Sequence, residues 1–186
     1  MVRRVSIVTR EEIPAEHQAA YDEIAGIRGR APTIGPSSVL IHSPEMAVRV
    51  SRVSEYLGEQ SQLTEKVKRL GALIAARSID CQFVWNAHAA AARRAGLNDS
   101  LVDALRDRAP LPAMAPNEAA IAEYGLELTR TNHVSQKTFD NAVAHLGVQG
   151  LTEYTTLIGY YRMIGLVANS ATIDLPDDLT EPLLPI

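Results

Sequence analysis

The sequence predicts an all-α, single-domain helical bundle of seven or eight helices. Apolar residues recur every three or four positions over most of its 186 residues, which is the spacing of one face of a helix. Short segments rich in proline, glycine and capping residues separate these stretches, and no alternating strand pattern competes with them. The length suits one domain, 1–186. Because aromatic residues make up only 5% of the chain, we expect a core of Ala, Leu, Ile and Val.

Proline and capping residues mark the first helices. Pro14 is placed in a first helical turn, and apolar residues then recur at helical spacing as far as Ile27. Residues 28–36 contain two glycines and two prolines, which predicts a loop. The triplet Ser43–Glu45 has the order N-cap, first-turn proline, first-turn acid. It predicts a second helix with an apolar stripe that reaches Leu57.

The middle of the chain predicts three further helices. Thr64 can cap the first of them. Asp80 is expected to cap the second, over residues 81–95, and Gly96 is placed to end it. A shorter helix is expected over 98–105.

A proline-rich linker, 109–116, separates these helices from the last ones. Pro116 opens one helix, Ser135 caps another that Gly147 stops, and Thr152 begins a long apolar helix. The tail, 173–186, holds three prolines and is expected to be extended. Its apolar residues could be covered by a neighbouring subunit.

Composition narrows the classes of function. A net charge of −4 with scattered basic residues argues against nucleic acid as a partner. A single cysteine excludes an internal disulfide and a multi-thiolate zinc site, and no His-x-x-x-His pattern predicts a metal. The longest apolar stretch, 157–168, is too short to span a membrane and contains Arg162. We expect a cytoplasmic protein without cofactor that acts on a small molecule.

The segment 76–88 is the part of the chain that could carry chemistry. In a helix that starts at Cys81, His88 returns to within about 20° of the same face, roughly 10 Å along the axis, with Trp85 between them. A thiol at a helix N-terminus is favoured as a thiolate, whereas the neighbouring Asp80 opposes this. His88 could move a proton to or from a substrate held over Trp85. The simpler interpretation is that all three residues are structural, because a lone cysteine is more often a small buried hydrophobe.

The run Lys68–Leu97 (KRLGALIAARSIDCQFVWNAHAAAARRAGL) resembles the core motif of the carboxymuconolactone decarboxylase and alkyl hydroperoxidase D-like superfamily. Leu40–Glu45 and Leu151–Met163 resemble it less specifically. The resemblance implies an all-α fold that assembles as a homo-oligomer, a trimer or hexamer, with an active site between helices near a subunit interface.

Two departures from the family pattern bear on the reaction. Cys81 and His88 match the first cysteine and the histidine of the peroxidase branch, but Val84 stands at the second cysteine. By ungapped count, Arg69 stands at the glutamate of the proton relay. The decarboxylase branch often has a glutamate before the tryptophan, and that position is Val84 too. The resemblance therefore makes hydroperoxide reduction by the usual dithiol route improbable.

These observations lead to three hypotheses. The leading one is a cofactor-independent decarboxylase or lyase for a small organic acid or lactone, with His88 and Cys81 as catalytic residues. Its expected substrate-binding residues are Trp85, Val84, Tyr161 and Arg162. The second is a thiol-dependent peroxidase that uses Cys81 alone, and the third is a non-catalytic helical assembly protein.

Overall fold

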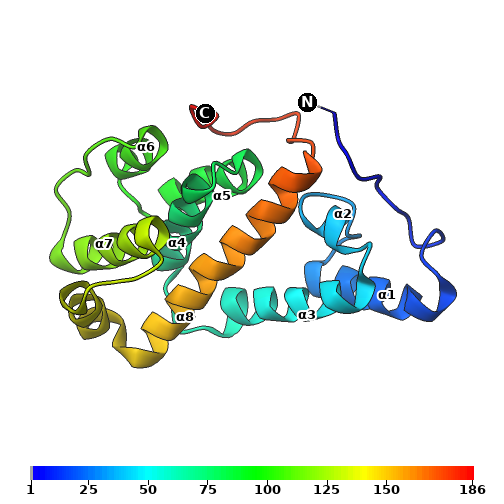
Figure 1. The fold of residues 1–186 in the computed structure, drawn as a ribbon, viewed down its shortest axis with the longest axis horizontal. Coiled ribbons are helices and arrows are strands. Elements are labelled where there is room, and N and C mark those ends of the chain that lie inside the picture. The colour runs from blue at the N-terminus through cyan, green and yellow to red at the C-terminus, as the bar shows by residue number, and fades with distance from the viewer. Residues whose placement is uncertain (1) are drawn as a thin grey trace.

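The computed structural model describes residues 2–186, which form eight α-helices, one 3-10 helix and one π-helix, and no strand (Figure 1). The all-α prediction is therefore confirmed. The helices are α1 (Gln18–Arg28), α2 (Ser37–Leu40), α3 (Pro44–Glu55), α4 (Glu65–Ser78), α5 (Gln82–Arg94), α6 (Asp99–Asp107), α7 (Pro116–Thr131) and α8 (Gln136–Ala171). The 3-10 helix is Ala15–His17, and the π-helix, Tyr56–Gln60, continues α3.

The local signals place most helix starts correctly. The Thr64 side chain accepts a hydrogen bond from the N–H of Val67, and Ser135 accepts one from Thr138 in the same way. The prolines at 44 and 116 occupy first helical turns. The break expected at Gly147 lies inside α8, where Gly147 has non-helical backbone angles (φ 67°, ψ 173°). Its positive φ suits a glycine, and it bends the chain before the long apolar part of α8.

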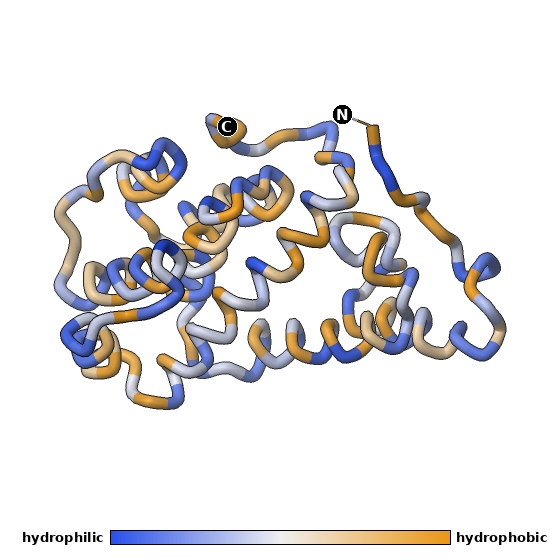
Figure 2. The backbone as a smooth tube through the Cα atoms, viewed as in Figure 1, coloured by the Kyte–Doolittle hydropathy of each residue, from blue (hydrophilic) through white to orange (hydrophobic). Residues whose placement is uncertain are grey.

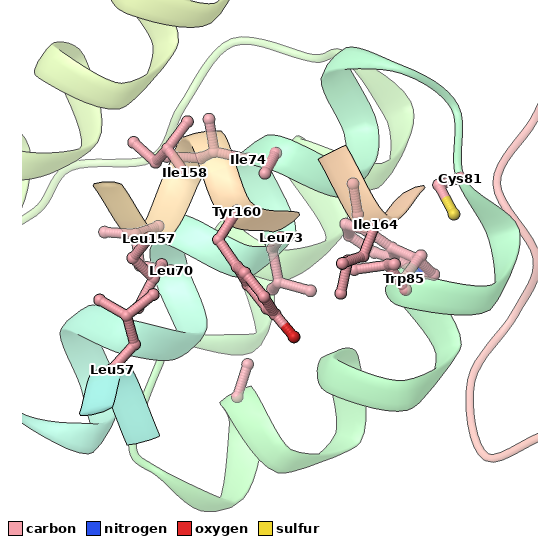
Figure 3. Packing of buried hydrophobic residues seen from close by; sticks show 14 of the residues in the cluster. Leu57, Leu70, Leu73, Ile74, Cys81, Trp85, Leu157, Ile158, Tyr160 and Ile164 are labelled. Atoms are coloured by element: carbon pink, nitrogen blue, oxygen red, sulfur yellow. The ribbon is translucent and has the colours of Figure 1, made fainter. Parts of the chain in front are cut away.

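Helix α4 is the centre of the bundle and packs against α5, α7 and α8. The close approach of α4 to α8 needs a residue without a side chain, because a Cβ on Gly71 would lie 2.7 Å from atoms of both Leu157 and Tyr154. Each helix alternates hydrophobic and hydrophilic residues along its length, as amphipathic helices do (Figure 2). The core between α4 and α8 is mostly leucine and isoleucine, with Trp85 and Tyr154 as its largest side chains (Figure 3).

Helix α5 begins one residue later than the sequence predicts. Asp80 does not cap it, because its backbone is left-handed (φ 50°) and its carboxylate pairs with Arg77 and Arg108. Cys81 is the N-cap residue instead, and Gln82 is the first helical residue. The cause is tertiary, since Arg108 comes from the end of α6.

The C-terminal tail is irregular, as expected, but it lies on its own chain. The Gln82 side chain donates to the Leu184 carbonyl and accepts from the Leu184 N–H, both at 2.8 Å. Arg93 pairs with Glu181, and Leu184 is 3% exposed. Of the three tail residues expected to need a neighbouring subunit for cover, Leu184 is thus covered by α5, whereas Leu183 and Ile186 are exposed.

Helix length and apolarity also bear on a membrane location. Within residues 2–186, no helix is both long enough and apolar enough to cross a bilayer.

Candidate functional site

Cys81 is buried at the start of α5. Its side chain is 0% exposed and packs against α8 at Gly165, where an added Cβ would lie 3.4 Å from Sγ. Burial raises the pKa of the Cys81 thiol, although hydrogen bonds from the backbone N–H groups of Val84 and Phe83 act in the opposite direction. The sequence left the direction of this shift open, and burial decides it. A neutral thiol follows at neutral pH.

A hollow of about 730 Å³ lies next to the residues that flank Cys81. It is lined by Asp80, Gln82 and Phe83 and by tail residues such as Ile173 and Asp174. Cys81 has no surface that opens into solvent, so a substrate would reach its sulfur only after this part of the chain moves.

His88 lies two turns further along α5, in charged surroundings. Arg69 of α4 donates from Nη1 to Nδ1 of His88 across 2.6 Å. The ring of Tyr161 from α8 meets the imidazole edge-on, with 4.7 Å between the ring centres. Burial and, next, the charge of Arg69 lower the pKa of His88 to about 3. The imidazole is therefore neutral at neutral pH, and its proton sits on Nε2 because Nδ1 accepts from the guanidinium.

Arg69 connects His88 to a carboxylate. Its Nε donates to Oε1 of Glu65 across 2.7 Å, one helical turn earlier on α4. A chain Glu65–Arg69–His88 results, in which the guanidinium separates the acid from the imidazole. The family pattern marks Arg69 only as the position of a missing relay glutamate. The ungapped count that placed it there was also the signal that its side chain would face His88.

A pocket of about 170 Å³ opens beside this chain. It lies where the π-helix meets α4 and α8, and its lining includes Gly58, Lys68, Arg69, Tyr160 and Tyr161. Lys68 donates from Nζ to the Gly58 carbonyl across 2.6 Å, which fixes the π-helix against α4. π-Helical turns are frequent at functional sites. Burial raises the pKa of Tyr161 to about 12, so its phenol keeps its proton and can donate it in a hydrogen bond.

The other residues expected to bind substrate lie elsewhere. Val84 is 2% exposed and Trp85 is 1% exposed, and both belong to the core. In Figure 3, Trp85 lies beside Ile164 in this core, with Cys81 near it at the start of α5. Arg162 donates to the side-chain oxygen of Asn132 at the end of α7, across 3.3 Å.

Cys81 and His88 both face α8, as their spacing predicts. Their contacts there, Gly165 and Tyr161, are four residues apart on that helix. Trp85 and Ile164 belong to the core between these two contacts. The structure therefore brings together His88, Tyr161 and Arg69, while the thiol contacts a different part of α8.

A metal would need ligands that this part of the molecule does not gather. Among residues 2–186, no group of three or more His, Cys, Asp or Glu side chains could hold a metal ion.

Comparisons with known proteins agree on the architecture. The model of the carboxymuconolactone decarboxylase family matches residues 44–124, which include α4 and α5. The alkylhydroperoxidase AhpD core of a peroxidase-related protein from Ralstonia eutropha JMP134 superposes with a TM-score of 0.73 at 14% identity, over 95% of this chain and 94% of that one. Residues 44–124 thus resemble the carboxymuconolactone decarboxylase family, and the fold is that of alkylhydroperoxidase AhpD-like proteins.

The debrominase Bmp8 shares this fold as well. Its apo structure superposes with a TM-score of 0.69 at 14% identity, over 93% of this chain and 92% of that one. A cysteine-to-alanine variant of Bmp8 in complex with 2,3,4-tribromopyrrole gives 0.70 at 14% identity, over 95% and 94%. No curated protein sequence matches the chain. At these identities the likeness concerns the fold, so the chemistry of this protein has to be argued from its own residues.

Proposed function

We propose that this carboxymuconolactone decarboxylase-like protein is a cofactor-independent lyase of the decarboxylase type, acting on a small organic acid or lactone. The observation that carries the proposal is the contact of Arg69 with His88 beside a pocket that Tyr161 also lines. The pocket lining supplies a cation for a carboxylate and a hydrogen-bond donor, and the proton carrier His88 contacts both of these residues.

The roles follow from the chemistry of decarboxylation. The carbon–carbon bond to the carboxylate breaks, carbon dioxide leaves, and the electron pair moves into an adjacent carbonyl group to form an enolate. His88 delivers one proton to the carbon, and the Tyr161 hydroxyl donates a hydrogen bond to the enolate oxygen. The reaction consumes one proton, so His88 must take up a proton from solvent in each cycle.

Cys81 has no proton-transfer role in this proposal. The thiol is buried and its pKa is raised, which leaves little thiolate at neutral pH. The alternative of a thiol-dependent peroxidase is for that reason not favoured over the lyase. The non-catalytic alternative would suit closed surroundings at His88, whereas a pocket lies beside its partners Arg69 and Tyr161.

Turnover of a panel of small keto acids, unsaturated acids and lactone acids would test the proposed function. Carbon dioxide release and NMR of the products would identify the substrate. We expect His88→Ala to lose about 100-fold or more in kcat, the usual range for a general acid or base. Equal activity of the variant on its best acid would rule out His88 as the proton carrier.

We also propose that the chain self-associates, as a trimer or hexamer. Large apolar side chains that are exposed on α3, on the π-helix and on α8 support this proposal: Met46, Val53, Tyr56, Val148, Met163 and Leu166. Light scattering after size exclusion would give the mass in solution. A monomer at micromolar concentration would contradict the proposal.

A further inference from the structure

In the resting site, Arg69 blocks the nitrogen that His88 would need to carry a proton. The guanidinium has hydrogen-bond donors only, so its contact with Nδ1 uses the ring's one free lone pair. Nε2 already holds the proton of the neutral ring. The imidazole can then donate a hydrogen bond from Nε2, but it cannot accept a proton while Arg69 stays in place.

Arg69 is held by two partners of unequal strength. Glu65 is a carboxylate whose side chain is 54% exposed, and His88 is a neutral acceptor. A carboxylate adds the attraction of opposite charges to the hydrogen bond, which a neutral imidazole cannot do, and guanidinium binds carboxylate through two parallel bonds. A second carboxylate in the pocket therefore offers Arg69 a better partner than the imidazole.

The charges around the pocket favour an anion. Arg69 and Lys68 line it from α4 against the single carboxylate of Glu65. Arg28 of α1 adds positive charge near Tyr161 of α8, and its Nε has no hydrogen-bond partner among residues 2–186. The groups that face His88 from the packed helices are thus Arg69, paired with Glu65, and the phenol of Tyr161. The positive charge is therefore in excess at this pocket, although the net charge of the whole chain is −4. A bound carboxylate would balance this local excess.

We propose that Arg69 is the carboxylate-binding residue of this site, and that a bound carboxylate frees Nδ1 of His88 by drawing the guanidinium away from it. Binding of the substrate then switches the imidazole from a blocked hydrogen-bond donor to a proton carrier. The substrate class is an open-chain or lactone acid that enters with its carboxylate ionised. This inference rests on the proposed function, since it names how the same site loads its proton.

The proton balance is complete without a co-reactant. The anion arrives, Arg69 turns to it, and Nδ1 takes one proton from a water molecule to give the imidazolium, with hydroxide released to solvent. Once carbon dioxide has left, the imidazolium gives one proton to the carbon of the enolate, and Arg69 returns to the neutral ring. In the absence of an acid, His88 stays neutral at neutral pH, with its single proton on Nε2.

NMR titration of the His88 ring tests this switch without any turnover. The probe is trifluoroacetate, which stays ionised over the range from about pH 3.5 to pH 8. Trifluoroacetamide serves as the uncharged match, and ¹⁹F line widths report whether either one binds. The His88 signal is assigned by its loss in His88→Gln. We expect the anion to raise the titration midpoint of His88 by at least about one pH unit, a tenfold gain in proton affinity, and the amide to leave it unchanged.

Substitution of Arg69 separates the switch from a general charge effect. In Arg69→Gln we expect the His88 midpoint to be raised without any anion, and trifluoroacetate to shift it no further. Arg94→Gln, an exposed arginine on α5, should keep the wild-type response. The proposal is overturned if trifluoroacetate fails to bind, if it binds without moving His88, or if Arg69→Gln keeps the full shift. The lyase assignment can fail in the turnover panel while this response persists, so the two failures are distinguishable.

Discussion

The start and the middle of α5 present the two reactive residue types of the chain in opposite surroundings. At the start, Cys81 is fully buried and packs against Gly165 of α8, and burial keeps the thiol protonated. Two turns later, His88 meets a guanidinium and a phenol beside a pocket. One helix thus has a packed end at Cys81 and a polar middle at His88. A reactive residue type is not enough to make a site, because its neighbours on α4 and α8 decide whether it can exchange protons.

Reversing the charge at Arg69 should have the largest effect on catalysis at the polar middle of α5, where Arg69 contacts His88. We expect Arg69→Glu to lower kcat/KM for an acid substrate by about 100-fold, since a desolvated charge pair is replaced by a repulsive one. Arg94→Glu, an exposed position on α5, makes the same change in net charge and should cost less than about threefold. Equal losses in the two variants would show that long-range charge, and not the Arg69 contact, governs binding.

The pH dependence of the free energy of unfolding should also report the surroundings of His88. The folded pKa of His88, about 3, lies below its ordinary value of 6.5, so between these two values only the unfolded chain binds this proton. The free energy of unfolding therefore falls as pH drops through this window, with a contribution of up to about 1.4 kcal/mol per pH unit. Urea unfolding at several pH values should show a shallower fall in His88→Gln. His133→Gln, in an exposed turn, is the control, and an unchanged slope in His88→Gln would contradict the burial of a neutral imidazole.

The packed end can be probed by adding a single methyl group. A Cβ on Gly165 would lie 2.5 Å from Cδ1 of Ile79, so we expect Gly165→Ala to lower the free energy of unfolding by about 1–3 kcal/mol. Gly159→Ala makes the same change on α8 where nothing lies within 4 Å, and should instead stabilise the helix by up to about 1 kcal/mol. Similar values for both variants, measured by urea unfolding, would mean that the space beside Cys81 is looser than described.

The tail should account for part of the protection of Cys81. Because the chain has one cysteine, labelling by a thiol reagent reports this residue alone. Arg93 holds Glu181 of the tail, whereas Arg94 is exposed and beside it in sequence. We expect Arg93→Gln to speed labelling about tenfold, as loss of roughly 1.4 kcal/mol of tail attachment implies, and Arg94→Gln to leave it unchanged. Identical rates in all three proteins would place the barrier in α5 and α8 instead of the tail.

The sequence predicts the fold well where local signals decide it. Thr64, Ser135 and Pro116 mark helix starts through their own capping chemistry, which needs no knowledge of distant residues. The start of α5 is different. Asp80 is of a residue type that often caps helices, but arginines from α4 and α6 hold it in a left-handed conformation. A pattern along one helix cannot show that competition.

The candidate site was predictable only in part for the same reason. Helical spacing correctly places Cys81 and His88 on one side of α5, but it says nothing of the core residues that separate their contacts. Trp85 looks like a pocket wall in a sequence and is a core residue in the structure. Arg69 looks like a lost relay residue, and its contact with His88 depends on how α4 packs against α5.

The most direct test of the central claim compares Cys81, at the start of α5, with His88, in its middle, in one assay. On the best acid substrate from the panel, we predict that His88→Gln lowers kcat/KM by about 100-fold or more and that Cys81→Ala changes it by less than about threefold. Circular dichroism of both variants would confirm that they are folded. The reverse order, with activity lost in Cys81→Ala and kept in His88→Gln, would contradict the account and move the chemistry to the thiol end.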